Sequence, residues 1–268
     1  MGFPLRFGAL YGALKELRTT SQPLLVAGVL SDQLARELTT GGDPAAVRTG
    51  GPPENVEALL YVIGDTVTQE DERVLKLAYR SRVPVIVVAA GRQVPLRIPF
   101  VPATEVVRVQ PGHGFPLDEI AEALVDRIDE RAASLARRLP ALRAATCERM
   151  IKSFSFKNGL IGVAVFIPGV DLPVLTLNQI RMVLQICMAH GLEIDAQRAP
   201  ELLATVAAGF GFRAFARELL TVVPGIGWAI KGGIAYGGTR AVGEAAVRYA
   251  ETRTARPLRP ASASPSSF

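Results

Sequence analysis

At 268 residues, the chain is long enough for two compact domains that each bury a core. Its composition, 49% hydrophobic and 21% charged, is apolar for a cytosolic protein but too charged for a protein with many membrane-spanning helices. Thirty Lys and Arg against 25 Asp and Glu give a net charge of +5, which suits an anionic lipid surface or simply solubility. Because no dense basic stripe with interleaved aromatic residues is present, we predict no nucleic-acid partner.

The two ends of the sequence differ from its middle. In residues 1–22, charged residues interrupt the apolar ones, so the segment does not match a secretory signal. We predict an amphipathic helix there, which packs on the body of the protein or lies on lipid. Residues 253–268, rich in Pro, Ser and Ala, lack apolar periodicity and predict a disordered tail.

Residues 23–140 alternate strand and helix signals, as expected of an α/β domain with a mostly parallel sheet and flanking helices. The strongest strands are residues 58–63 and 84–89, near-continuous apolar runs typical of strands buried on both faces. Further strand signals lie at residues 24–29, 105–109 and, as a short edge strand, 45–48. Helix signals lie at residues 31–38, where Ser31 or Asp32 is the predicted cap, and at residues 68–79. Pro116 opens a third, long amphipathic helix. Its apolar side consists of Leu117, Ile120, Leu124, Ile128 and Leu135.

Residues 141–252 predict an all-α domain that contains an apolar hairpin. A polar connector helix, residues 141–157, leads into the apolar run of residues 160–167, which a Pro-Gly pair ends. Thr176 and Gln179 form a capping-box pattern that predicts the start of the next helix. The basic residues of the connector precede this hairpin, as they would on the cytoplasmic flank of a membrane-associated element.

Further helix signals follow Gly191, which is predicted to end the hairpin. They lie at residues 200–208, 213–222, 228–236 and 239–251. Gly233 and Gly237 have a small-xxx-small spacing that allows two helices to approach closely.

A conventional membrane-spanning helix needs about twenty predominantly apolar residues. Residues 159–177 contain Asp171 and two prolines, and residues 219–238 contain Lys231 and a proline. Burying one such charge unpaired at the bilayer centre costs about 2.5 to 3.5 kcal/mol. We therefore expect hairpin or peripheral attachment to a membrane. The alternative is a helical domain whose apolar faces bury one another.

A family resemblance covers roughly residues 150–250. It is carried by FIPGVDLPVLTLNQIRMVLQI and by LLATVAAGFGFRAFARELLTVVPGIGWAIKGGIAYGGTRAVGEAA. These stretches resemble the YcjF-type family, a bacterial domain of unknown function that commonly follows an Era-like GTPase module. The resemblance implies association with the bacterial inner membrane and with GTPase-like modules, and it implies no catalytic residues.

The first half resembles a small GTPase core that has lost its nucleotide chemistry. VVRVQPGHGFPLDEIAEALVDRI is similar to the last strand, loop and helix of such a core. A P-loop needs glycine, lysine and a hydroxyl residue, and the positions counted from Gly28 hold Gln33, Leu34 and Ala35. After Val88, Ala-Ala-Gly-Arg stands where a guanine-reading Asn-Lys-x-Asp is expected. Asp65 could orient magnesium, but a lone acidic residue after a strand is more often a turn residue.

Few residues in the chain are suited to acid-base or metal chemistry. Cys147 and Cys187 lie far apart in the sequence, which favours free thiols in a reducing cytoplasm over a disulfide framework. Cys187 and His190 share a helix face, but two ligands make no zinc site. His113 lies in a PGHG loop with no nucleophile arrangement near it. We therefore predict no catalytic, cofactor-binding or metal-binding residues.

The best candidates for an interaction are polar residues inside the apolar second half. These are Asp171, Asn178, Gln179, Arg213 and Arg217. The alternative role for these side chains is capping and internal hydrogen bonding.

These observations favour a non-catalytic, membrane-associated adaptor or regulatory protein, cytoplasmic and attached to the inner membrane or to a protein partner there. One alternative is a sensor or enzyme that holds a nucleotide or small ligand near Gly28, Gly64, Asp65 and Gly91, at the carboxyl ends of the strands. Another is a soluble scaffold in which apolar helical faces join copies of the chain.

Overall fold

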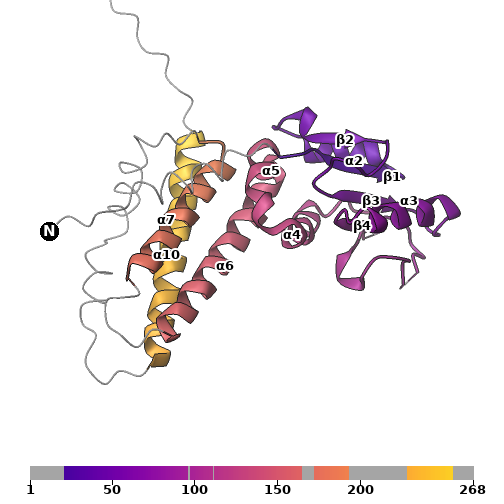
Figure 1. The fold of residues 1–268 in the computed structure, drawn as a ribbon. Coiled ribbons are helices and arrows are strands. Elements are labelled where there is room, and N and C mark those ends of the chain that lie inside the picture. The colour runs from indigo at the N-terminus through magenta and orange to yellow at the C-terminus, as the bar shows by residue number, and fades with distance from the viewer. Residues whose placement is uncertain (1–20, 96, 111, 165–171, 193–227, 256–268) are drawn as a thin grey trace, which may run out of the picture.

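The computed structural model describes residues 21–95, 97–110, 112–164, 172–192 and 228–255. A five-stranded, all-parallel sheet with flanking helices is followed by a helical region, which confirms the predicted order of an α/β part and an α part (Figure 1). Several predicted segments lie outside the described residues: the helix at residues 1–22 except for the last two, the helices at 200–208 and 213–222, and the tail from residue 256.

The sheet has the order β2-β1-β3-β4-β5, which is also the order of flavodoxin-like doubly wound sheets. Its strands are β1 (Leu24–Gly28), β2 (Val47–Thr49), β3 (Leu59–Ile63), β4 (Val85–Ala89) and β5 (Val106–Arg108). Every residue of β3 and β4 is buried, as their continuous apolar runs predict. All five strands overlap the predicted ranges.

Alternate side chains of the strands enter two separate cores. Leu60 and Ile86 face α2 (Ser31–Leu38) and α4 (Leu117–Ile128), whereas Tyr61 and Val87 face α3 (Gln69–Arg80). Thr68 and Asp71 cap α3 reciprocally in a capping box. The predicted cap of α2 is wrong: Leu30, with φ 54°, is the residue that precedes the helix, and its side chain makes no capping hydrogen bond.

The long helix predicted after Pro116 is broken, because Asp129 takes φ 45° and ends α4. The apolar side predicted for this helix continues in α5 (Ala132–Arg138), whose Leu135 is buried in the same core as Leu124. Four short 3-10 turns complete this part of the chain: Pro44–Ala46, Ala103–Glu105, Asp129–Arg131 and Pro140–Leu142.

Three long helices form a bundle that extends away from the sheet (Figure 1). They are α6 (Arg143–Ala164), α7 (Leu172–Ala189) and α10 (Trp228–Ala255). The predicted connector and the described part of the apolar run after it, residues 160–164, belong to one helix, α6; the rest of the run lies outside the described residues. Thr176 lies inside α7, so the predicted capping box there is wrong. Gly191, with φ 79°, follows the end of α7 as predicted.

Helix α10 runs without interruption through the two helices that were predicted separately, and it continues to Ala255. Gly233 and Gly237 face open space, so they are not the close-packing positions. Gly232 and Gly243 have that role. A Cβ at either would lie 2.5 Å from a side-chain atom of α6, on Val163 and Ile151 respectively.

The sheet and the bundle share one hydrophobic core, which passes through α5. Arg143 strengthens this junction, because its Nε donates to the carbonyl oxygens of Ala136 and Ala189 at 3.4 Å and 3.1 Å. Among the described residues, no helix combines the length and the apolar character needed to cross a membrane.

Candidate membrane-docking surface

One end of each of α6, α7 and α10 lies away from the sheet (Figure 1). Large apolar residues near these ends are exposed. They are Phe156, Leu160, Val174 and Tyr236, with 60%, 53%, 49% and 36% of their surface exposed. We call these four residues the distal surface. Single exposed apolar residues are common, but a group of them marks an interaction site.

Part of the distal surface forms a continuous stripe. Lys152, Phe156 and Leu160 follow one another at four-residue intervals, which places them on the same face of α6. Tyr236 of α10 lies beside this helix, because a Cβ at Gly159 would be 3.3 Å from its Cβ. Exposed Gly233 and Gly237 flank the tyrosine without adding side chains. A lysine therefore borders an apolar stripe that crosses from α6 toward α10.

In the described helix segments that carry the distal surface, the charged residues are all basic. Residues 150–164, 172–189 and 228–239 contain four Lys and Arg and no Asp or Glu. In the described part of the chain, no carboxylate lies within ion-pair distance of Lys152 or Lys157. The Lys157 ammonium instead lies 5.6 Å from the centre of the Phe154 ring. Lys152 and Lys157 are therefore available to an anion that approaches this end of the bundle.

A buried polar cluster joins the three helices at this level. Asn158 donates to Thr239 Oγ1 at 2.9 Å and accepts from Asn178 at 2.8 Å. Gln179 Nε2 also donates to Thr239 Oγ1, at 3.3 Å. The threonine hydroxyl in turn donates to the Ala235 carbonyl at 2.8 Å. These bonds fix the register of the helices that present the distal surface.

At the other end of the bundle, a cysteine and a histidine meet beside a cavity of about 870 Å³ between α6 and α10. Cys147 Sγ lies 3.6 Å from His190 Nε2. Burial, with smaller contributions from Glu251 and Cys187, raises the pKa of Cys147 to about 12 against the effect of Arg143. The thiol therefore stays protonated, and it is a poor nucleophile. Within the described ranges, no group of three or more His, Cys, Asp or Glu could hold a metal ion.

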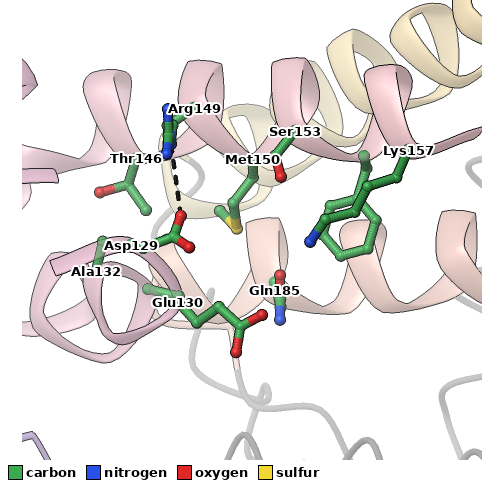
Figure 2. Close-up of a pocket in the computed structure, with 11 residues that line it drawn as sticks. Asp129, Glu130, Ala132, Thr146, Arg149, Met150, Ser153, Lys157 and Gln185 are labelled. Carbon is green, nitrogen blue, oxygen red and sulfur yellow. Dashed lines mark ion pairs between the residues drawn. The ribbon is translucent and has the colours of Figure 1, made fainter. Parts of the chain in front are cut away.

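A smaller crevice lies where the short turn after α4 meets the bundle. Figure 2 shows Asp129 directed at Arg149 of α6, with Glu130 and Gln185 nearby. Arg149 lies 3.5 Å from the Asp129 carboxylate and 3.1 Å from that of Asp126. The crevice volume of about 30 Å³ has room for about two water molecules. Its polar groups therefore join the sheet part to the bundle, and they leave no space for a substrate.

At the carboxyl ends of β3 and β4, the loops that follow the two strands pack backbone against backbone. The Asp65 carboxylate accepts the backbone N–H of Arg92 at 2.6 Å. A Cβ at Gly91 would lie 2.4 Å from the backbone nitrogen of Asp65. Asp65 therefore ties the loop after β3 to the loop after β4, which is the turn role considered for it.

The structure places two of the five candidate interaction residues. Asn178 and Gln179 point into the bundle and hydrogen-bond within it, which is the alternative considered for them. Asp171, Arg213 and Arg217 lie outside the described residues. Phe156 and Tyr236 were missed as candidates because polarity was the criterion. The four-residue spacing of Lys152, Phe156 and Leu160 could have revealed the stripe.

Comparison of the chain with protein-family models, with curated proteins and with solved structures found no match. The YcjF-type and GTPase-like resemblances therefore stay predictions.

Proposed function

We propose that this protein is a non-catalytic, membrane-associated adaptor or regulatory protein of the bacterial cytoplasm. It docks on the anionic inner surface of the plasma membrane through the distal surface. The observation that carries this proposal is the exposure of Phe156, Leu160, Val174 and Tyr236 at an end of the bundle where the described segments 150–164, 172–189 and 228–239 contain Lys and Arg but no Asp or Glu.

The physical basis is the combination of apolar burial with charge attraction. Transfer of a fully exposed Phe or Leu side chain to an apolar environment contributes about 1.5 to 3 kcal/mol. A lysine near an anionic leaflet contributes about 1 kcal/mol. Phe156, Leu160 and Lys152 lie on one face, so a single orientation of α6 on the lipid surface uses all three contributions. Such docking does not require a helix that crosses the bilayer.

The sheet part is proposed to be a GTPase-like module without a nucleotide site. Two features support this. Gln33 and Leu34 stand where a phosphate-binding loop would carry its second glycine and its lysine, and the Asp65 carboxylate accepts a hydrogen bond from the Arg92 backbone. In this proposal, the module gives the adaptor a rigid body that presents a binding surface to a partner.

Vesicle co-sedimentation of the full chain tests the proposal. We expect binding to phosphatidylcholine vesicles that contain phosphatidylglycerol and little binding to phosphatidylcholine alone. The double variant Phe156→Ser/Leu160→Ser should lose binding. The matched control Val29→Ser/Leu30→Ser removes two side chains of similar exposure, 49% and 57%, from the sheet part and should bind normally.

Two outcomes would overturn the proposal. One is that the full chain does not bind the anionic vesicles. The other is that the distal and control variants lose binding equally. Sedimentation without lipid separates a further case, because self-association abolished by Phe156→Ser/Leu160→Ser would make the distal surface an interface between copies of the chain.

A further inference from the structure

A second surface site lies at the amino ends of β4 and β5, opposite the strand ends that usually bind ligands. It is a cavity of about 490 Å³. The end of α3, the turn at residues 81–84, the loop before β5 and the end of α4 form its walls. This volume is within the range of small-ligand and short-peptide sites.

One wall of the cavity is aromatic. The rings of Tyr79 and Phe100 are 5.9 Å apart and inclined by 41°. Although they contact each other, they stay 64% and 43% exposed. Two exposed rings side by side form a flat apolar platform, on which another aromatic or aliphatic side chain can pack.

The charged groups at the cavity are mostly positive. Arg80, Arg82 and Arg127 contribute to its lining together with one acidic residue, Glu105. The Glu105 carboxylate already pairs with Arg127 at 3.0 Å. Across the described residues, Arg80 and Arg82 have no carboxylate within ion-pair distance. Two guanidinium groups are therefore available to an incoming anion.

Backbone strain is a separate observation at the same cavity. Arg82 and Phe100 have φ of 55° and 66°, in the left-handed region that bulky residues avoid. Glycine would adopt these conformations without strain. Arg82 is the left-handed residue of the cap that ends α3, where the N–H groups of Arg82 and Val83 donate to the carbonyls of Tyr79 and Ala78. Phe100 lies in a turn closed by a hydrogen bond from the Val101 N–H to the Ile98 carbonyl. These two turns fix where the arginine and the phenylalanine stand at the cavity.

We propose that this cavity binds a peptide segment of a partner protein in which an acidic residue neighbours an aromatic one. The carboxylate pairs with Arg80 and Arg82, and the aromatic side chain packs on Tyr79 and Phe100. A polyanion such as nucleic acid or a lipid surface fits less well, because residues 21–140 carry 13 Lys and Arg against 16 Asp and Glu. The site can therefore bind a ligand with one or two negative charges, whereas the net negative charge of the surrounding region repels a polyanion.

The test measures fluorescence anisotropy of a labelled five-residue peptide of alternating aspartate and phenylalanine, titrated with the full chain. Arg82→Asn removes the positive charge, and asparagine tolerates the left-handed backbone conformation at this position. Phe100→Gly removes the aromatic ring, and glycine adopts the left-handed conformation without strain. Each should weaken binding by about threefold or more. Lys76→Gln removes an exposed charge from α3 outside the cavity and should leave the affinity unchanged.

A thermal melt distinguishes binding from a structural role. If the two side chains serve the ligand, the melting temperature of Arg82→Asn and Phe100→Gly stays unchanged or rises. A lower melting temperature with unchanged peptide affinity would overturn the proposal. It would also fail if the peptide does not bind, if a lysine–phenylalanine peptide binds equally well, or if an oligo-dT strand binds more tightly. Vesicle binding by Arg82→Asn should be normal, so this site and the distal surface can fail independently.

Discussion

The thiol of Cys147 meets the imidazole of His190 across two helices, with Sγ and Nε2 3.6 Å apart. Cys147 belongs to α6, and His190 directly follows the end of α7. Both residues are buried. The contact therefore joins the two helices in surroundings that disfavour a charge on either group.

Acidification should destabilise the protein through His190. Burial, followed by the nearby Arg143 guanidinium, lowers the pKa of His190 below its ordinary value of 6.5, against the opposing effect of Glu251. Because the unfolded state takes up the proton first, the free energy of unfolding should fall as pH drops below 6.5 toward the folded-state pKa. Above pH 6.5, the histidine should contribute no pH dependence. Urea unfolding at several pH values measures this. His190→Gln should flatten the response, whereas His113→Gln should retain it.

Both cysteines should resist thiol reagents in the folded protein. Burial raises the pKa of Cys187 to about 12, as it does for Cys147, so neither forms thiolate at pH 8. A chromogenic disulfide reagent should react slowly with the native chain and promptly with both thiols in guanidinium. Rapid labelling of the native protein would show that one of the thiols is accessible and ionised. Cys147→Ala and Cys187→Ala would then identify it.

Substitution of alanine for glycine should destabilise the protein at one position of α10 and stabilise it at another. At Gly243 the new Cβ would lie 2.5 Å from Ile151 Cγ1, so Gly243→Ala should destabilise the fold by about 1 to 3 kcal/mol. Gly237 faces open space, and Gly237→Ala should stabilise the helix by up to about 1 kcal/mol. Chemical denaturation of both variants measures the difference. Equal effects would contradict the close packing of α10 against α6.

The hydroxyl of Thr239 should be more important than its shape. Thr239→Val keeps the side-chain volume but leaves the amides of Asn158 and Gln179 without their acceptor, which should cost about 1 to 3 kcal/mol. Thr239→Ser keeps the hydroxyl and should lose much less. Thermal melts of the two variants provide the comparison. A valine variant as stable as the wild type would mean that the polar cluster contributes little to the bundle.

Reversal of charge at Lys152 should weaken vesicle binding without affecting the fold. Lys152→Glu replaces an attraction to anionic lipid by a repulsion, a change of about 2 kcal/mol or roughly thirtyfold in affinity. Arg36→Glu makes the same change on α2 and should have little effect. The difference should shrink in high salt because charges at a surface are screened. If both variants bind alike, binding depends on net charge rather than on the distal surface.

Sequence patterns predicted the sheet well because its strands are buried on both faces. Such strands consist of nearly uninterrupted apolar residues bounded by turns, and β3 and β4 follow this pattern directly. The helices were harder to delimit. The break at Asp129 has no glycine or proline to announce it, and α10 runs through Gly237 and Gly238 where the sequence indicated a boundary. In the second case, packing against α6 outweighs the low helix propensity of glycine.

Features formed by distant residues could not be predicted from local spacing. Cys187 was considered with His190 because the two are three positions apart, yet the histidine contacts Cys147, 43 positions away. Asn178 and Gln179 were recognised as unusual polar residues, but their direction into the bundle depends on where Asn158 and Thr239 lie. The aromatic cavity likewise combines α3 with a loop that precedes β5.

The sheet part and the far end of the bundle differ in charge, and this difference affects how the protein orients near a charged surface. Excess acidic residues lie in residues 21–140, whereas the far parts of the bundle helices carry only basic ones. Among the described residues, this separation of charge is an electric dipole directed from the sheet part toward the bundle. Near a negatively charged surface, the resulting torque orients the distal end of the bundle toward that surface before any contact forms.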